Sequence, residues 1–170
     1  MNSNVQSFEQ AGQGLNLEVS GERPVSGNGV LQIARTAPDA RLPLRAHPDD
    51  AGLDLYGLED FRVEPQQGKV TRTGIAMAIP TGHVGMVVDR SSMAKKGLKI
   101  AGGIIDAGYR GEVHVVLWNL SADAVEIKAG ERIAQMMIVP IRTPAVEEVP
   151  GVEALGQTSR GTGGFGSTGK

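Results

Sequence analysis

Short apolar runs, bounded by glycine, proline, asparagine or aspartate, recur along the middle of the chain. Several are rich in β-branched residues, which is typical of strands. The predicted strands span residues 30–34, 69–73, 74–79, 83–88, 112–120, 125–127 and 132–139. Within 113–120, apolar residues occupy both faces, which predicts a strand buried between two sheets. Only residues 92–98 favour a helical turn or two, so the pattern predicts an all-β sandwich or jelly roll.

The same pattern divides the chain into three zones. Residues 1–29 are polar and show no sustained period, which predicts a mostly disordered N-terminal extension. Residues 30–149 carry the periodic pattern and form the predicted domain. Residues 150–170 end in a glycine-rich segment, which predicts a flexible C-terminal arm. Two turns are expected within the domain, at Pro80–His83 and Lys128–Glu131, because proline presets φ and glycine accepts a positive φ.

Composition narrows the classes of function. The chain has 170 residues, enough for one domain with a core, and its 24 glycines favour turns over long helices. A net charge of −2 argues against a non-specific binder of duplex DNA, which needs a basic face. The lack of cysteine excludes disulfides, thiolate metal sites and cysteine nucleophiles. No signal peptide or membrane-spanning run is recognised, so we expect a cytoplasmic protein without membrane or nucleic-acid partners.

Two loop segments combine charged and small residues in a pattern that suits ligand binding. In Ala51–Leu55, the lone acidic residue Asp54 stands between two leucines, and a carboxylate at a turn or strand end is the plainer interpretation. Asp89–Gly97 follows an apolar run and places Arg90 and two serines at the start of a helical turn. An arginine fork and free backbone N–H groups suit phosphate oxygens, while an ordinary helix cap with a basic face is the alternative.

A third segment, Gly102–Gly111, sets Asp106 and Tyr109 between glycines, which predicts a hairpin that another molecule can approach closely. An ionised aspartate only accepts hydrogen bonds, so Asp106 could deprotonate a water and accept from a sugar hydroxyl. A turn with a structural aspartate is the alternative. The glycine-rich C-terminus carries Phe165, a combination that suits phosphates and a stacked base. A tail without a role explains the same composition.

Two other kinds of site are not favoured. The three histidines, His47, His83 and His114, are far apart in the sequence and lack the spacing of metal ligands. The phosphate-binding patterns of ATPases and dinucleotide enzymes are absent, because the glycines of residues 161–166 lie in a terminal tail with no following helix.

Taken in order, five segments resemble the motifs of the trimeric deoxyuridine triphosphatase (dUTPase) family. They are Ala51–Leu55, Arg90–Lys96, Ile105–Gly111, Gly130–Met136 and Arg160–Gly169. The fifth segment matches nearly letter for letter, and five motifs in this order with familiar spacing are specific as a set. The resemblance covers roughly residues 30–170.

This resemblance implies a β jelly roll assembled as a homotrimer, with active sites at subunit interfaces and C-terminal arms exchanged between subunits to close over them. The implied reaction is hydrolysis of dUTP to dUMP and pyrophosphate by water attack on the α-phosphorus, which keeps uracil out of DNA and supplies dUMP for thymidylate synthesis. Mg²⁺ is the implied cofactor, chelated mainly by the triphosphate and reached by Asp54 and Gln135 through water. A hard cation prefers such phosphate and water oxygens.

Carried over by motif, Asp106 is the implied catalytic residue, which activates the water and accepts from the sugar 3′-hydroxyl. Tyr109 would lie against the deoxyribose, where a ribose 2′-hydroxyl would clash. The backbone around Gly103, Ile104 and Ile105 would read the uracil edge and leave no room for a thymine methyl. The phosphate chain and the outer face of uracil would be held by Arg90, Ser91, Ser92, Gln135, Arg160, Phe165, Gly166, Ser167 and Thr168, with the Phe165 ring on the base.

The second motif departs from the common family pattern, Pro-Arg-Ser-Gly, because Asp89 and Ser92 stand at its first and last positions. A carboxylate beside a phosphate site is unfavourable unless Asp89 points away, as strand alternation from Arg90 allows. The segment between Arg90 and Asp106 is also slightly shorter than in common family members, which bears on the uracil contacts.

Two alternative functions stand beside dUTP hydrolysis. A dCTP deaminase, or a bifunctional deaminase and dUTPase, shares the Arg-Ser-Ser segment. Deamination needs a general acid and base, in that family a glutamate on the strand after the third motif, and Val113–Asn119 contains none. A non-catalytic nucleotide-binding module on the same fold is the other alternative, against which Asp106, Arg90 and the complete tail argue.

Overall fold

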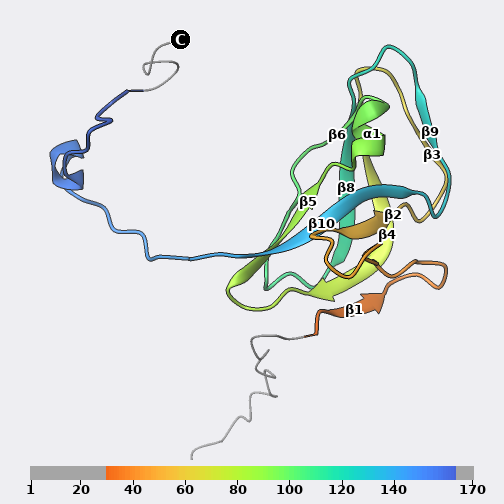
Figure 1. Ribbon diagram of the computed structural model, residues 1–170, viewed down its shortest axis with the longest axis horizontal. Helices are drawn as coiled ribbons and strands as arrows, with labels where there is room; N and C mark the ends of the chain where they lie inside the picture. Colours follow the sequence, from red (N-terminus) through yellow and green to blue (C-terminus); the bar gives the residue numbers. More distant parts are fainter. Residues whose placement is uncertain (1–29, 164–170) are drawn as a thin grey trace, which may run out of the picture.

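The computed structural model describes residues 30–163, and two antiparallel sheets pack face to face in this part of the chain (Figure 1). The first sheet has the strand order β1 (Gln32–Arg35), β4 (Gly68–Ala78), β8 (Glu112–Asn119) and β6 (Leu98–Ile100). The second has the order β2 (Leu53–Tyr56), β10 (Arg132–Pro140), β5 (His83–Val88) and β7 (Ile104–Ile105). The strands β3 (Phe61–Val63) and β9 (Val125–Ile127) form a separate pair.

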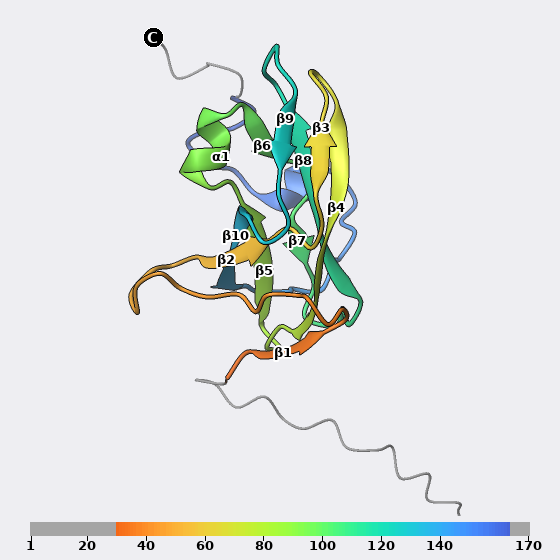
Figure 2. The ribbon, with the colours of Figure 1, turned by 90° about the vertical axis from the view of Figure 1, so that its right-hand side faces the viewer.

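The core lies between these layers, with β4 and β8 on one side and β2, β5 and β10 on the other (Figure 2). On β8 every second side chain is buried, and the apolar ones are Val113, Val115 and Leu117, because successive side chains of a strand point to opposite faces. Leu55 and Met136 are fully buried from the opposite sheet. Burial of these aliphatic groups is the main favourable contribution to folding. The all-β sandwich predicted from the sequence is confirmed.

The prediction that β8 is buried on both faces is wrong for this chain. Its outer face carries Trp118, which is 45% exposed, and the following Leu120 is 60% exposed. Val70 on the neighbouring β4 is 59% exposed on the same face, since it pairs with Val116. The first sheet is an outer layer of the chain, so only its inner face meets the core. An apolar strip therefore remains open on its outer face.

β4 joins two of the predicted strands into one long strand with a bulge. The register against β8 shifts between Arg72 and Ala76, and Gly74 adopts a φ of 69° at this point. A Cβ on Gly74 would lie 2.7 Å from the Cβ of Ala40. Glycine is required here both by the positive φ and by the close packing, and the bulge bends the sheet over the core.

The longer predicted strands agree with the structure, and the two predicted turns are present. The His83 amide donates to the Pro80 carbonyl at 3.0 Å, and the Glu131 amide donates to the Lys128 carbonyl at 3.0 Å. The helical turn lies slightly earlier than predicted: helix α1 spans Ser91–Lys95, and β6 begins at Leu98. Pairing of Leu98–Ile100 with β8 explains this difference, because these residues satisfy their backbone groups in the sheet.

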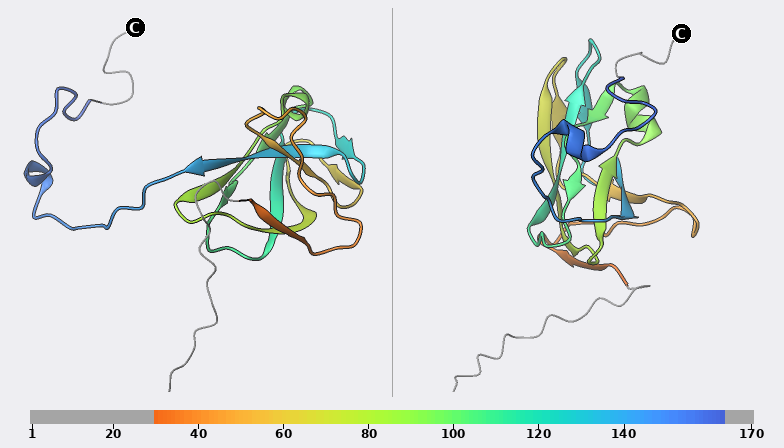
Figure 3. Two further views of the ribbon diagram at one scale, coloured as in Figure 1. Left: turned by 60° about the horizontal axis from the view of Figure 1, so that its bottom comes forward. Right: turned by 90° about the vertical axis from the view of Figure 1, so that its left-hand side faces the viewer.

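After β10 the chain leaves the sandwich and extends away from it (Figure 3). This segment contains a short 3₁₀ helix, η1 (Val152–Leu155), in which Val152 and Leu155 are exposed. Val146 is fully exposed before it. The predicted extension 1–29 lies outside the described residues, and the division at residues 30, 149 and 150 stays a prediction. Within residues 30–163, no helix is long and apolar enough to cross a membrane.

Candidate active site

One candidate site lies at the end of β5, beside β10 and the next strand of the sheet, β2. The Asp54 carboxylate on β2 stands between two arginines: Oδ1 lies 2.8 Å from Arg90 Nε, and Oδ2 lies 3.2 Å from Arg132 Nη1. The Asp54 side chain is only 13% exposed. A cavity of about 290 Å³, called the arginine cavity below, is lined by Ala46, Asp50, Ala51, Gly52, Asp54, Arg90, Ser91 and Gln135.

Gln135 on β10 completes this cavity through its packing. Its Nε2 donates to the Asp89 carbonyl at 2.8 Å. The residue pairs with Asp54 on one side and with Val88 on the other. A Cβ on Gly52 would stand 2.2 Å from Gln135 Oε1. Glycine at position 52 therefore makes room for the glutamine side chain.

The carboxylate of Asp89 points away from Arg90, as strand alternation predicts. It forms an ion pair with Lys99 and accepts a hydrogen bond from the Ile100 amide at 2.7 Å, both on β6. Burial by itself raises the pKa of Asp89, but the Lys99 and Ile100 hydrogen bonds outweigh it and hold the pKa below its usual range. The extra acid of the second motif is neutralised on the first sheet, away from the arginine cavity.

The helix α1 follows Arg90 directly and adds hydroxyl and amide groups to this region. The Arg90 carbonyl accepts hydrogen bonds from the Met93 and Ala94 amides, both at 2.9 Å. The first N–H groups of a helix have no partner within it, which leaves them free for oxygen ligands. Ser91 lines the arginine cavity, while Ser92 Oγ accepts from Arg90 Nη1 at 3.3 Å. The predicted set Arg90, Ser91, Ser92 and Gln135 is thus brought together.

A second candidate site is formed by the turn between β7 and β8. The Tyr109 amide donates to the Asp106 carbonyl at 3.0 Å and closes the turn. Asp106 and Tyr109 are both exposed. A cavity of about 210 Å³, called the turn cavity below, is lined by Ile104, Ile105, Asp106, Tyr109, Glu112 and His114.

The prediction of a hairpin around Asp106 is wrong, although the turn itself is present. β7 pairs with β5 in the second sheet, whereas β8 pairs with β4 and β6 in the first. The segment between β7 and β8 therefore crosses from one sheet to the other. This crossing places Asp106 at an edge where both layers contribute, because it follows Ile105 of β7 and precedes Glu112 of β8.

The segment before Asp106 is tied to β5 through its backbone. The Gly103 carbonyl accepts from the Val87 amide at 2.7 Å. Gly103 has a φ of 95°, and a Cβ there would lie 2.6 Å from the Val87 carbonyl oxygen. The neighbouring Ile104 is exposed. Gly103 and Ile104 thus form a narrow backbone ledge next to the turn cavity.

The two cavities lie at opposite ends of β5. Ile105 pairs with Gly85, which places Asp106 near the start of β5, whereas Arg90 lies two residues after Val88, the last residue of β5. Six residues of extended chain span roughly 20 Å. The catalytic candidate and the phosphate-binding candidates of one chain are therefore too far apart to act on the same phosphate group.

Among residues 30–163, Arg160 is the predicted residue of the C-terminal arm, and it is brought to neither cavity. Arg160 Nε donates to the Gly163 carbonyl at 3.0 Å within the arm, and Arg160 lines neither the arginine cavity nor the turn cavity. Four further predicted residues lie outside the described residues: Phe165, Gly166, Ser167 and Thr168.

Sequence reasoning missed two charged residues of these sites, Arg132 and Glu112. Arg132 lies within the fourth motif and pairs with Tyr56 on β2, three positions before Gln135. Arg90 and Arg132 also line a neighbouring cavity of about 440 Å³ with Arg41 and Tyr56. A charged residue opening an apolar strand is a usable signal for such a role. Glu112 is likewise a charged residue that opens an apolar strand, β8.

Within residues 30–163, no group of three or more His, Cys, Asp or Glu side chains is placed to hold a metal ion. Two carboxylates line the arginine cavity: Asp54 is already paired with two guanidinium groups, and Asp50 accepts a hydrogen bond from the His47 amide. A divalent ion in this region would need oxygen ligands from another molecule, because Mg²⁺ requires about six.

A sequence model of the dUTPase family matches residues 38–169. The chain belongs to the dUTPase family. It is 50% identical over 149 residues to the deoxyuridine 5′-triphosphate nucleotidohydrolase of Corynebacterium jeikeium, covering 85% of this chain and 96% of that protein. The enzyme of Rhodococcus erythropolis is 48% identical over 143 residues, with 82% and 85% covered. The human mitochondrial enzyme is 43% identical over 150 residues, with 87% of this chain and 58% of that protein covered.

Solved dUTPase structures share the fold of this chain. The dUTPase of Staphylococcus bacteriophage 80alpha with dUpNHpp has a TM-score of 0.76 and 34% identity, covering 83% of this chain and 99% of the other. A mutant dUTPase from phage phi11 of S. aureus, described with a structural Mg(II) ion, has a TM-score of 0.68 and 32% identity, covering 74% and 99%.

Proposed function

We propose that this chain hydrolyses dUTP to dUMP and pyrophosphate. The observation that carries the proposal is the exposed Asp106 carboxylate beside Tyr109 in the turn cavity of a dUTPase-family chain. Its curated relatives carry the name of this activity, and a solved relative binds a dUTP analogue. The arginine cavity supplies the complementary groups for a triphosphate.

In the proposed reaction Asp106 is the general base. A water oxygen attacks the α-phosphorus, Asp106 takes the proton of that water, and the bond from the α-phosphorus to the bridging oxygen breaks. The electron pair leaves with the β-phosphate oxygen as pyrophosphate. A positioned base of this kind contributes about 10²–10⁴-fold to a rate. The second Asp106 oxygen accepts from the sugar 3′-hydroxyl, which holds the nucleotide and the base in one arrangement.

The turn cavity also suits the nucleoside. The Tyr109 ring provides a flat face for deoxyribose and fills the space that a ribose 2′-hydroxyl would need. The backbone of Gly103, Ile104 and Ile105 runs beside this cavity, and backbone N–H and C=O groups read the edge of a base by hydrogen bonds. The ties of Gly103 to Val87 keep this edge rigid, which supports discrimination against a thymine methyl.

The arginine cavity suits the phosphate chain. Arg90 offers a planar fork of N–H donors, and Ser91 lies at the first turn of α1, where donors also point outward. Gln135 adds an amide that is already fixed against Asp89 and Gly52. In this proposal the arm closes over the outer phosphates, and the Phe165 ring stacks on uracil. The arm residues involved are Arg160, Phe165, Gly166, Ser167 and Thr168.

Mg²⁺ fits this site as an ion carried by the substrate. Asp54 and Gln135 are the two oxygen ligands that we propose for its water shell, and the guanidinium groups of Arg90 and Arg132 surround Asp54. Two such donors suit contact through water and cannot make a protein cage. The ion would supply charge neutralisation to the triphosphate and would favour the leaving of pyrophosphate. Asp54 and Gln135 would orient its water ligands.

The active form that we propose is a homotrimer, because one chain separates the two halves of the site along β5. A neighbouring chain would bring its arginine cavity to the turn cavity of the first, and the arm would reach across the same interface. The open apolar strip of Val70, Trp118 and Leu120 supports this assembly, since contiguous exposed apolar surface marks an interaction site. A cytoplasmic location stays a prediction from the sequence.

A deaminase reaction is the weaker alternative on this geometry. Glu112 is the second carboxylate that lines the turn cavity, but its oxygens are bound to Arg72, Gly74 and Thr36 and its pKa is lowered to about 2. A carboxylate held ionised in this way is unsuited to deliver a proton to a base ring.

One assay separates the proposed activity from the alternatives. The purified chain is given dUTP or dCTP with Mg²⁺, and both pyrophosphate and ammonia are measured. Pyrophosphate from dUTP is the expected result, and the Asp106→Asn variant is the matched control for contaminating phosphatases. Ammonia from dCTP would point to deamination, and neither product would point to a binding module.

A further inference from the structure

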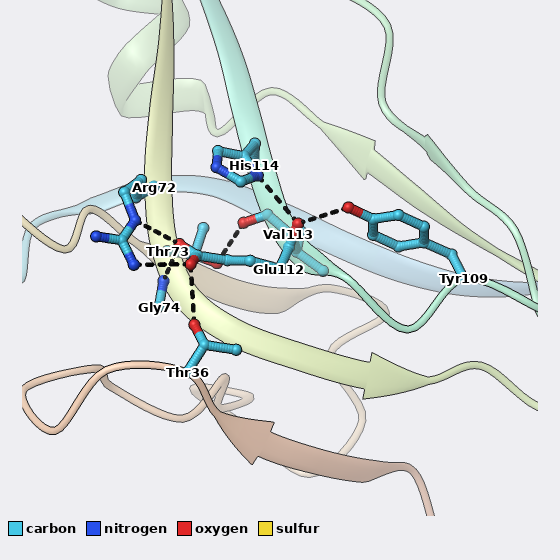
Figure 4. A network of polar contacts seen from close by, with 8 residues as sticks. All are labelled: Thr36, Arg72, Thr73, Gly74, Tyr109, Glu112, Val113 and His114. Atoms are coloured by element: carbon cyan, nitrogen blue, oxygen red, sulfur yellow. Dashed lines mark hydrogen bonds and ion pairs between the residues drawn. The ribbon is translucent and has the colours of Figure 1, made fainter.

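The carboxylate of Glu112 accepts four hydrogen bonds in a single network (Figure 4). Oε1 accepts from Arg72 Nε at 3.1 Å and from the Gly74 amide at 2.9 Å. Oε2 accepts from Arg72 Nη2 at 2.8 Å and from Thr36 Oγ1 at 2.9 Å. Three chain segments, β8, β4 with its bulge and the loop after β1, thus meet at one side chain.

This network fills the bulge of β4. The shift of register around Gly74 interrupts the ladder between β4 and β8, and the Gly74 amide donates to the Glu112 carboxylate. Two adjacent contacts complete the junction: the Gly74 carbonyl accepts from the Thr36 amide at 2.7 Å, and Thr73 Oγ1 donates to the Val113 carbonyl. The side chain of Glu112 therefore replaces the missing part of the ladder and fixes where β8 begins.

The charged group next to Glu112 keeps its carboxylate ionised. The hydrogen bonds from Arg72 are the main cause that lowers the pKa of Glu112 to about 2, opposed by burial and supported by the Gly74 and Thr36 contacts. The Glu112 side chain is 13% exposed. Hydrogen bonds to an ionised, shielded acceptor are stronger than neutral ones, so the position of Glu112 is well determined.

The backbone of the same residue holds the Tyr109 side chain. The Tyr109 hydroxyl donates to the Glu112 carbonyl at 3.0 Å, and His114 Nδ1 lies 3.0 Å from the same oxygen (Figure 4). A carbonyl oxygen can accept two hydrogen bonds. A Cβ on Gly111 would lie 2.4 Å from the Tyr109 hydroxyl oxygen, so the ring lies directly over this glycine.

We propose that Glu112 is a positioning residue that sets the Tyr109 ring, and through it the selection of deoxyribose over ribose. Its carboxylate is locked to β4 and the loop after β1, its carbonyl holds the Tyr109 hydroxyl, and the ring closes the sugar side of the turn cavity. Glu112 acts through Tyr109 and has no contact with the reacting phosphate. The proposal rests on the proposed hydrolysis of dUTP.

The substitution Glu112→Gln tests the four hydrogen bonds of the carboxylate while it keeps the size and shape of the side chain. The glutamine amide would turn N–H donors toward the donors of Arg72 or Gly74, so at least one of the four hydrogen bonds becomes a repulsion. The start of β8 should shift and release the Tyr109 ring. We expect the ratio of kcat/KM for dUTP to that for UTP to fall by about fivefold or more, mainly through KM.

The matched control is Glu126→Gln. Glu126 on β9 also pairs with an arginine across two strands, since its Oε1 lies 3.3 Å from Arg62 Nη1, but it lies in the β3–β9 pair and lines neither site cavity. In Glu126→Gln the ratio of kcat/KM for dUTP to that for UTP, called the nucleotide ratio below, should stay unchanged. Thr36→Val, which removes one bond, and Arg72→Gln, which removes two, provide graded and gentler variants if E112Q does not fold.

A double-mutant cycle with Tyr109→Phe distinguishes positioning from a general loss of stability. Tyr109→Phe removes the hydroxyl that Glu112 holds, so adding E112Q to it should lower the nucleotide ratio little further. Fully additive effects on the ratio, or an unchanged ratio in E112Q or in the two gentler variants, would overturn the proposal while the wild-type chain still releases pyrophosphate from dUTP. A wild-type chain that releases none would overturn the proposed function, and this inference with it.

Discussion

The two cavities at the ends of β5 hold their aspartates in opposite ways. Asp54 in the arginine cavity is enclosed, 13% exposed and paired with Arg90 and Arg132. Asp106 in the turn cavity is exposed, and no hydrogen bond to its side chain is found among residues 30–163. The Asp54 carboxylate holds the guanidinium groups of Arg90 and Arg132 in place. The lone pairs of Asp106 stay available to a ligand. Environment, more than residue type, therefore separates a structural acid from a candidate base.

The supporting contacts differ in the same way. The arginine cavity is built from side chains that interlock across β2, β10 and β5, with Gln135 fixed against Gly52 and the Asp89 carbonyl. The turn cavity is built from backbone, because Tyr109 is held by the Glu112 carbonyl and the segment before Asp106 by the Val87 amide. Preorganised donors suit the binding of fixed phosphate charge, and an unengaged carboxylate suits proton transfer.

The largest effect is expected from a substitution that changes the turn cavity alone. Asp106→Asn removes the proposed base but keeps the size of the side chain, so kcat for dUTP should fall by about 10²–10⁴-fold. Circular dichroism should change little, since no contact within the described residues depends on this side chain. The KM for dUTP should also change little, because the asparagine oxygen still accepts from the sugar 3′-hydroxyl. A loss of less than about tenfold in kcat would show that proton transfer does not pass through Asp106.

Mixing two inactive variants tests whether the cavities of different chains work together. Asp106→Ala keeps the arginine cavity, and Arg90→Ala keeps the turn cavity, so each alone should be nearly inactive. In co-refolded trimers mixed one to one, about a quarter of the sites would combine the two intact halves. Pyrophosphate release should recover to that level. If mass spectrometry confirms mixed trimers and no activity returns, each chain builds its own site.

A smaller effect is expected from disturbing the packing of the arginine cavity. In Gly52→Ala the new methyl group would displace Gln135 from the Asp89 carbonyl, and KM for dUTP should rise by roughly tenfold. Gln135→Ala is the matched variant and should have a similar KM. Adding Gly52→Ala to Gln135→Ala should then change KM little, because the displaced group is already gone. Additive effects would mean that Gly52 acts on another contact.

The smallest expected effect concerns stability in acid and separates Glu112 from the exposed acids. The folded chain lowers the pKa of Glu112 from 4.5 to about 2, so the unfolded chain binds more protons between these values. The stabilisation by Glu112 is complete above pH 4.5 and is lost as the pH falls toward 2. The difference in melting temperature between the wild type and Glu112→Gln should therefore shrink over this window. For Glu126→Gln the difference should stay near zero throughout.

The sequence by itself determined the longer strands, the short strand β9 and the turns. His83–Val88 and Val125–Ile127 were predicted with the bounds of β5 and β9, because apolar runs closed by glycine, proline or lysine–glycine turns carry their own signal. The motifs also named Asp106, Tyr109, Arg90 and the other candidates, and the family assignment that they suggested is confirmed. These features depend on residues close together in the chain, which is where sequence patterns are informative.

Tertiary structure alone decided four short strands and the connection of the sheets. β2, β3, β6 and β7 have four, three, three and two residues, and none of them was predicted from the sequence, although the equally short β1 and β9 were. β2, β6 and β7 each pair with a longer strand that satisfies their backbone groups, as β5 does for Ile104–Ile105, whereas β3 pairs with the equally short β9. The predicted hairpin failed for the same reason, since the partner of β7 was chosen by the second sheet.

The polar contacts of the site were likewise decided by the fold. Asp54 meets Arg132 across 78 positions of sequence, and Glu112 meets Thr36 across 76. A local pattern contains no information about partners so distant, whose approach depends on the order and register of the strands between them. The sequence therefore supplied the chemical groups, and packing decided which carboxylate is clamped, which stays free, and how far apart the two cavities lie.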